Sequence, residues 1–336
     1  MKIKLPVYFI IIISPLLLAG LALFLGSYDM SPRMVLKIIA EGISPVSSGL
    51  TNIPERSIIM DIRLPRIILA GLVGIALSVS GVTLQGIFRN PLVDPFILGI
   101  SAGAALGCAV SIGFFPAFPV QVPAFLFSII AVFLAYIIAG TQGEISRLPL
   151  ILSGVIISAF FTALVSIVKF LVDPHKLQNI VYWLMGSFAL ADWQQVHIAG
   201  LGIAAGLIPI FFMRWRLNVI SMGDDEARTL GVHVTRERII FIAASTLIVS
   251  VAVSVSGIIG WVGLMVPHLL RMLCGPDHKN LVPLSIAGGA SFMIFADTLA
   301  RNMTSFDIPV GIITAIIGAP FFVYLMQRGG KESWGR

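Results

Sequence analysis

The chain has 336 residues, of which 57% are hydrophobic and 11% charged, and its mean hydropathy is +1.00. A soluble domain carries about 25% charged residues, and a fold of this size cannot bury so large an apolar excess in its own core. The composition therefore excludes a soluble globular protein and predicts an integral membrane protein, with no polar stretch long enough for a separate catalytic domain. The net charge of +6 combines 22 lysines and arginines with 16 acidic residues, and their placement carries more information than their sum.

Ten apolar runs follow one another along the chain, and one helical crossing of a bilayer requires about 20 such residues. The runs are continuous rather than alternating, which excludes the strands of a membrane barrel. We expect an all-α integral membrane protein of about ten transmembrane helices, with residues 1–336 forming a single transmembrane domain. The predicted spans are residues 5–26, 64–86, 92–114, 117–139, 148–171, 193–213, 239–259, 261–275, 281–300 and 308–327.

The first run, residues 5–26, follows Lys2 and Lys4 and could be mistaken for a signal peptide. It is longer than the apolar region of such a peptide, and no small-x-small cleavage site stands before the next polar stretch. We expect it to be retained as the first transmembrane helix.

The distribution of lysine and arginine predicts the orientation. With the N-terminus inside and the spans alternating, 14 of the 22 cations lie inside, so the positive-inside rule places both termini in the cytoplasm. Most of the outside cations lie around one predicted loop, residues 27–66, and this cluster needs a separate reason. The outside cations are Arg33, Lys37, Arg56, Arg63, Arg66, Lys169, Lys176 and Arg301.

Two halves of the chain share a short motif. Residues 78–81 have the sequence Ser-Val-Ser-Gly, and residues 254–257 repeat it. An odd number of spans separates the two copies, so they would be inverted in the membrane, as in many transporters. We therefore predict an inverted internal repeat with halves at about 60–171 and 239–327.

The largest polar segment on the predicted inside is residues 214–238. Within it, three acidic residues follow Gly223, where a helix dipole favours negative charge, and Gly231 suits the end of the same short helix. The helix would lie against the cytosolic face with Ala227 and Leu230 on one side. It is either a solvated connector or a docking element for a cytosolic partner. The residues assigned to it are Gly223, Asp224, Asp225, Glu226, Ala227, Arg228, Leu230 and Gly231.

The sequence Gly-Asp-Asp-Glu-Ala-Arg-Thr-Leu-Gly-Val at residues 223–232 resembles the coupling-helix segment of one family. This family comprises the permease subunits of binding-protein-dependent ABC importers for iron chelates, haem and cobalamin. Other motifs agree with it in the same order between about residues 60 and 325. They lie at residues 63–66, 84–92, 183–188, 263–271, 296–301 and 309–315.

The resemblance implies a type II ABC importer permease fold and a homodimer with its pathway at the subunit interface. Two cytosolic ATPase subunits would bind the coupling helices, and a periplasmic or lipoprotein substrate-binding protein would deliver the ligand. The chain would be no enzyme and would bind no cofactor, since ATP and Mg belong to the partner ATPase. In agreement, the phosphate-binding pattern Gly-x-x-x-x-Gly-Lys-Ser/Thr is missing from the sequence, and Gly330-Lys331 is followed by Glu332. Membrane lipid is the other expected partner, and nucleic acid is not one.

The implied substrate is an iron chelate (a siderophore or haem) or a cobalamin-type ligand, moved across the cytoplasmic (inner) membrane by ATP hydrolysis on the separate subunit. Small oxyanions use similar permeases, and recognition belongs largely to the binding protein. We favour an iron chelate because this substrate is the most frequent in the family.

The resemblance also gives the outlying cations a role. Residues matching Arg63, Arg66 and Arg301 would face outward and pair with acids on the binding protein. Arginine suits this role because its planar guanidinium binds carboxylate in a bidentate manner and stays charged. The alternative is that these arginines reach lipid headgroups or form local pairs, and Arg301 stands four residues after Asp297, the spacing of a helical ion pair.

An ion-coupled secondary transporter is the alternative function. Ion coupling usually places acidic residues or histidine in mid-membrane, whereas here the acids cluster at span ends and residues 239–270 contain none. His268 lies in an apolar span with no second ligand one turn away. Cys108 and Cys274 have no metal-ligand spacing, so we expect no metal site.

Overall fold

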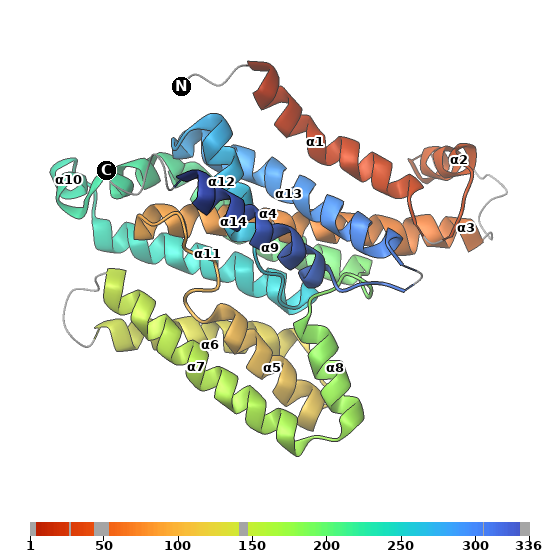
Figure 1. The fold of residues 1–336 in the computed structure, drawn as a ribbon, viewed down its shortest axis with the longest axis horizontal. Helices are drawn as coiled ribbons and strands as arrows, with labels where there is room; N and C mark the ends of the chain where they lie inside the picture. Colours follow the sequence, from red (N-terminus) through yellow and green to blue (C-terminus); the bar gives the residue numbers. More distant parts are fainter. Residues whose placement is uncertain (1–4, 27, 44–53, 141–146, 305, 330–336) are drawn as a thin grey trace.

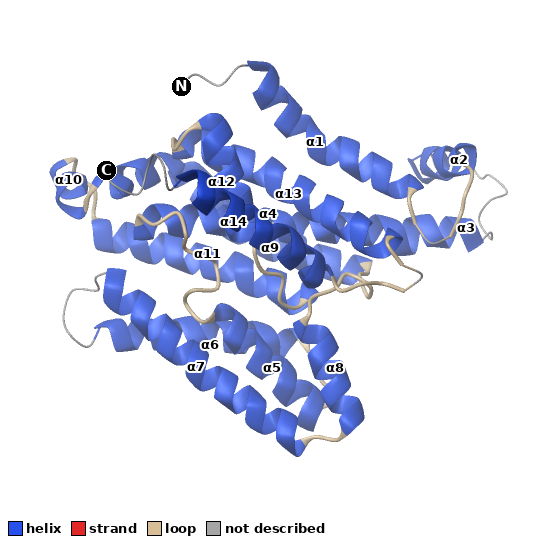
Figure 2. Ribbon diagram, viewed as in Figure 1, coloured by secondary structure: helices blue, strands red, loops and turns tan. Residues whose placement is uncertain are grey.

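The computed structural model of the chain describes residues 5–26, 28–43, 54–140, 147–304 and 306–329. Every regular element in this part of the chain is a helix (Figure 2). In chain order the elements are α1 (Leu5–Phe24), α2 (Pro32–Ile43), α3 (Pro54–Ser57), the π-helix η1 (Ile58–Arg63), α4 (Leu64–Phe88), α5 (Ile100–Phe114), α6 (Gln121–Gly140), α7 (Arg147–Leu171), α8 (Pro174–Leu184), α9 (Trp193–Met222), α10 (Asp224–Thr229), α11 (Val234–Ser256), α12 (Val262–Cys274), α13 (His278–Asn302) and α14 (Val310–Gly329).

Seven helices within the described residues are long and apolar enough to cross a membrane, and three shorter apolar helices, α5, α12 and α14, accompany them. Together these helices coincide with the ten predicted spans. The predicted all-α membrane fold is therefore confirmed.

One predicted span begins too early. Residues 92–114 are helical only from Ile100 onward. The preceding helix α4 ends where Arg89 adopts a left-handed conformation with φ 50°. Pro91 and Pro95 follow, and because proline lacks the N–H that a helix interior needs, the connecting chain forms turns instead.

Another predicted span ends too early. The span at residues 193–213 continues as helix α9 to Met222. The polar segment 214–238 therefore begins inside a helix, and its first two arginines, Arg214 and Arg216, lie at the end of a long span rather than in a loop.

Helix α4 is the centre of the larger of two packed units, and most of its residues are buried. Helices α9, α11, α12 and α13 pack against it (Figure 1). The closest approach is to α13, where Gly74 faces Gly289 so tightly that neither position has room for a Cβ atom. Small residues at such a crossing allow close van der Waals contact between helices, which stabilises helix pairs in lipid.

Helices α5 to α8 form a smaller unit with a hydrophobic cluster of its own, visible as the lower layer in Figure 1. This unit contacts the larger one mainly through α6 and α5 against α11. In the predicted repeat, α4 and α11 are the first helices of the two halves, and α6 and α13 are the third. The repeat would make the α6–α11 and α13–α4 contacts equivalent, yet α6 packs on α11 less extensively than α13 packs on α4. The inverted repeat itself stays a prediction.

The two ends of the bundle differ. At one end α2 and η1 pack together around Val35, Ile38 and Ile59. At the opposite end α10 lies beyond the ends of the long helices (Figure 1). The two sets of predicted functional residues are therefore on opposite sides of the bundle.

Candidate coupling and docking sites

The predicted coupling residues form the short helix α10 at one end of the bundle. It begins at Gly223, whose carbonyl accepts a hydrogen bond from the amide of Ala227 at 2.9 Å, and its first three residues are acidic. It ends before Gly231, which has φ 77°, a left-handed conformation that glycine adopts without the steric cost of a Cβ atom. The start and end signals of this helix therefore lie where the sequence predicts them.

The two apolar residues of α10 differ in burial. Ala227 is fully buried, whereas Leu230 is 61% exposed, so only Ala227 packs against the bundle. Leu230 caps the helix, and its amide still donates to the carbonyl of Glu226 at 3.2 Å.

Asp224 joins α10 to the ends of three membrane helices. Its Oδ1 accepts a hydrogen bond from Arg89 Nη2 at 3.1 Å and another from Arg147, and its Oδ2 accepts one from Arg238 Nη2 at 2.9 Å. Arg89 caps α4, Arg147 is the first residue of α7 and Arg238 lies in the second turn of α11. One carboxylate therefore connects the short helix to α4 and α7, which are distant in sequence, and to α11, which follows it in the chain.

The protonation state of Asp224 follows from these contacts. Burial raises the pKa of the carboxyl, but the ion pairs with Arg238 and Arg147 outweigh burial and hold the pKa below the ordinary aspartate value of 3.8. The carboxylate is therefore ionised at physiological pH, and its attraction to the guanidinium groups would be lost only as the pH falls below that ordinary value.

A second acidic residue supports the same end of α11. Glu237 is buried and accepts a hydrogen bond from Arg216 of α9. Since its neighbour Arg238 reaches Asp224, consecutive charged residues connect α11 to α9 on one side and to α10 on the other.

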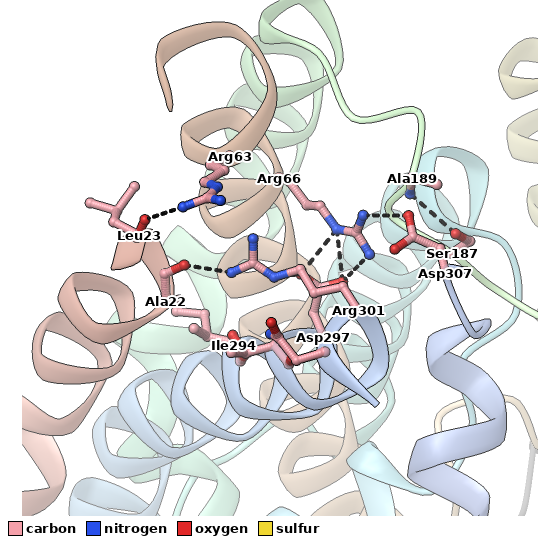
Figure 3. Close-up of polar contacts among 12 residues, drawn as sticks. Ala22, Leu23, Arg63, Arg66, Ser187, Ala189, Ile294, Asp297, Arg301 and Asp307 are labelled. Carbon is pink, nitrogen blue, oxygen red and sulfur yellow. Dashed lines mark hydrogen bonds and ion pairs between the residues drawn. The ribbon is translucent and has the colours of Figure 1, made fainter. Parts of the chain in front are cut away.

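The three predicted docking arginines lie together at the opposite end of the bundle, on η1, α4 and α13 (Figure 3). Each is almost fully buried, with Arg63 4%, Arg66 7% and Arg301 5% exposed. Arg66 donates from Nε to the two carboxylate oxygens of Asp297 at 3.0 and 3.1 Å, and from Nη1 to Asp307 at 2.8 Å. Its guanidinium is thus occupied by acids of the same chain.

Arg63 and Arg301 bind main-chain carbonyl groups at the C-terminal end of α1. Arg63 donates to the carbonyl of Leu23 at 2.8 Å, and Arg301 donates to the carbonyl of Ala22 at 2.6 Å. The last carbonyls of a helix have no partner within it, and the helix dipole favours cations there. Arg301 also lies 4.0 Å from Asp297, which is the local pair expected from their spacing.

A cavity of about 270 Å³ opens beside this cluster, and its wall includes all three arginines and Asp307. Asp297 and Asp307 pair with Arg66, and Asp29 lies close enough to Arg63 to interact with its charge, so three acids stand against the three arginines. The structure brings the predicted docking residues together, and their role in docking stays a prediction.

Sequence reasoning missed the partners of both sites. Arg89, Arg147 and Arg238 are far apart along the chain, and no spacing connects them to Asp224. Asp307 was likewise not singled out. The available signal was charge. Arg89, Arg147 and Arg238 each stand at the predicted inside end of a span, and the acidic helix predicted at the same side of the membrane needs counter-charges.

Comparisons with known proteins agree with the fold. The model of the FecCD transport family matches residues 12–328. A probable iron chelatin transport system permease protein of Helicobacter pylori is 45% identical, with 81% of this chain and 82% of that protein aligned. The molybdate import system permease protein of Haemophilus influenzae is 39% identical, with 94% of each chain aligned.

A solved structure, described as an inward-facing conformation of a transporter assigned to the metal-chelate ABC type, superposes with a TM-score of 0.86 at 36% identity. The match covers 97% of this chain and 100% of that chain. The family match over almost the whole chain, the relatives and the structural likeness together show that the chain is an ABC importer permease of the FecCD transport family.

Proposed function

We propose that two copies of this chain form the pathway of an importer that carries an iron chelate across the cytoplasmic membrane, driven by two separate cytosolic ATPase subunits. The observation that carries this proposal is the attachment of α10, through Asp224, to the ends of α4, α7 and α11. A displacement of α10 by a partner would act on three spans at once. A permease driven by a separate motor protein requires such a connection.

The surface around α10 suits a protein partner. Met222 precedes the helix and Leu230 follows it, and their side chains are 63% and 61% exposed, so each end of α10 offers an apolar side chain to a partner. Asp225 and Glu226 are exposed beside them and would set the orientation of a basic partner surface. We assign this surface to the ATPase subunit, which would also hold ATP and Mg.

One face of α7 suits a pathway between two copies. Ser158, Thr162 and Ser166 are one helical turn apart, and each hydroxyl donates to the carbonyl one turn earlier. Thr162 and Ser166 are exposed, and Lys169 continues the same edge of the helix. Polar side chains of spanning helices usually face a bundle interior or a water-filled cavity, and a second copy related by a two-fold axis would enclose this stripe.

At the other end, we assign docking of the substrate-binding protein to the cavity beside Arg63, Arg66 and Arg301. Contacts within the chain already occupy these side chains. Docking there would therefore use the wall of the cavity and the partly exposed Asp307, rather than arginines that extend into solvent.

In the orientation that this proposal implies, α10 and both chain termini lie on the cytoplasmic side of the membrane. The arginines that contact α10 and the end of α9 support it, because they add to the positive charge at that end of the bundle. This orientation separates the two partners, with the ATPase subunits inside and the binding protein outside.

The choice of ligand rests on the relatives. The iron chelatin permease of Helicobacter pylori has the higher identity, 45%. Molybdate is a second candidate, because the molybdate permease of Haemophilus influenzae aligns with 94% of this chain. Proteoliposomes with the chain, its cognate ATPase and its binding protein should accumulate a radiolabelled iron chelate, and excess molybdate should not compete. Molybdate accumulation without iron uptake would contradict the assignment.

A further inference from the structure

The last turn of α9 leads directly into α10. Only Gly223 separates Met222, the last residue of α9, from Asp224, the first residue of α10. A displacement of α10 would therefore act first on the end of α9, and would pass from there to the helices that this end holds. Asn218 lies in this part of α9, about one helical turn before Met222.

Asn218 makes three hydrogen bonds to the start of α13. Its Oδ1 accepts from the amide nitrogen of His278 at 2.8 Å and lies 2.8 Å from Nδ1 of the same residue. Its Nδ2 donates to Oδ1 of Asp277 at 2.6 Å. Because a backbone amide can only donate, Oδ1 is the atom that faces His278, and Nδ1 carries the proton that completes the third bond.

These bonds make Asn218 a cap for α13 that comes from another helix. Asp277 caps α13 from within the chain, and its side chain accepts a hydrogen bond from the amide of Lys279. The amide of His278 is one of the first donors of the helix, which have no acceptor within it. Asn218 supplies the acceptor, so this donor is satisfied only while the end of α9 stays in place.

His278 is buried where several helix ends meet. It is 6% exposed, and its ring lies so close to α4 that a Cβ atom on Gly86 would be 2.7 Å from Nε2. The adjacent residue of α4, Gln85, accepts a hydrogen bond from Nη2 of Arg271 in α12 at 2.8 Å. The ends of α4, α9, α12 and α13 are therefore held together by neighbouring side chains.

Asn218 and Asp224 hold different helices. The ion pairs of Asp224 attach α10 to α4, α7 and α11, whereas Asn218 attaches the end of α9 to α13. Within the part of the chain that the structure describes, one other side chain of α9 bonds to the start of α13, namely Arg214, whose Nε donates to the carbonyl of Lys279 at 3.2 Å. With three bonds against one, Asn218 supplies most of this polar attachment.

We propose that Asn218 is a positioning residue that passes a displacement of α10 to α13, and through Arg271 and the short connection at residues 275–277 to α12. The inference rests on the proposed function, because it takes the ATPase subunit to act on α10. Without Asn218, α13 would still pack along α4. Loss of this residue should therefore weaken coupling rather than abolish it.

The test exchanges an amide and a carboxylate between two positions. Asn218→Asp places a second carboxylate against that of Asp277, and the two like charges should push the start of α13 away from α9. Adding Asp277→Asn returns an amide donor to the contact, and asparagine caps a helix about as well as aspartate does. The double variant therefore keeps every bond of the wild type with donor and acceptor exchanged.

The measurement is uptake per ATP hydrolysed in proteoliposomes that contain the chain, its ATPase and its binding protein. The probe is a radiolabelled iron chelate, or radiolabelled molybdate if the wild type accumulates that instead. Asn218→Asp should lower the ratio about fivefold, the effect expected for loss of one helix cap. The double variant should return to within about twofold of the wild type.

Two further variants separate positioning from a loss of folding. Asn218→Ala removes the three bonds without adding a charge, should lower the ratio to a similar extent, and replaces Asn218→Asp if that variant does not fold. Asn179→Asp makes the same change at an exposed asparagine of α8 and should leave the ratio unchanged. Thermal unfolding of each variant shows whether a lower ratio accompanies a loss of stability.

Two results would overturn the inference. One is a wild-type ratio in both Asn218→Asp and Asn218→Ala. The other is a double variant that unfolds at the wild-type temperature but has a ratio as low as that of Asn218→Asp. Failure of the proposed function looks different, because the wild type itself would then show no uptake that depends on ATP, and this inference would be refuted with it.

Discussion

Replacement of Asp224 by asparagine removes the charge that holds α10 to three helices while the shape of the side chain changes little. Two unit charges about 3 Å apart attract strongly at low dielectric constant, but the Asp224 side chain is 35% exposed, and solvent reduces the attraction. Exposed pairs contribute about 0.2–1 kcal/mol each. The pair with Arg238, whose side chain is only 7% exposed, belongs at the upper end of that range. Together the three pairs contribute about 1–2 kcal/mol.

A loss of about 1–2 kcal/mol changes the balance between attached and detached α10 by a factor of about 5–30. ATP hydrolysis would continue on the partner subunit, but its motion would reach the spans less often. The expected result of Asp224→Asn is therefore a fall of that size in substrate transported per ATP hydrolysed, measured in proteoliposomes with the ATPase and binding protein.

The matched control is Asp173→Asn, the same change at an exposed carboxylate at the start of α8, outside the α10 surface. It should leave the transport-to-hydrolysis ratio within about twofold of the wild type, as expected for an exposed surface substitution. If Asp224→Asn and Asp173→Asn gave the same ratio, the connection through Asp224 would have no part in coupling, and the reasoning would be refuted.

Three further substitutions test the fold and its functional ends. Arg66→Met leaves Asp297 buried without its main partner and should destabilise the chain by about 3–5 kcal/mol in thermal unfolding. The double variant with Asp297→Leu should recover most of this lost stability. Failure to recover would show that the loss of the ion pair is not the cause. If the recovered double variant also binds the substrate-binding protein normally, Arg66 is structural and not a docking residue. Gly74→Ala places a Cβ atom against the main chain of α13 and should cost about 1–3 kcal/mol, whereas Gly71→Ala, which meets only side-chain atoms at 3.5 Å or more, should cost much less; equal costs would contradict the close crossing. Gly231→Val strains the left-handed residue after α10 by about 1–2 kcal/mol and should lower transport per ATP hydrolysed; an unchanged ratio would count against α10 as the coupling element.

The membrane fold could be predicted from the sequence because its signals are local. Runs of apolar residues define the spans, and Gly223 and Gly231 mark the ends of α10. The predicted helix boundaries were wrong where contacts between distant parts of the chain, rather than local sequence, determine where a helix begins or ends. The turns around Pro91 and Pro95 delay α5, and α9 continues past its predicted end to Met222.

The electrostatic partners could not be predicted, because they join residues distant in sequence. The outward arginines were expected to extend toward a partner, yet Arg66 is bound by Asp297 and Arg63 by the end of α1. Burial of a guanidinium group requires partners for its charge, and only the packed structure shows that this chain supplies them. The one local pair predicted from spacing, Arg301 with Asp297, is present at 4.0 Å.

The central claim is that this chain is a pathway driven by a separate ATPase through α10. The most direct test is uptake of a radiolabelled iron chelate by proteoliposomes that contain the chain, its ATPase and its binding protein, with no ion gradient across the membrane. The account predicts uptake that requires ATP, is inhibited by vanadate and is unaffected by a protonophore. Uptake that a proton or sodium gradient drives without ATP would contradict it.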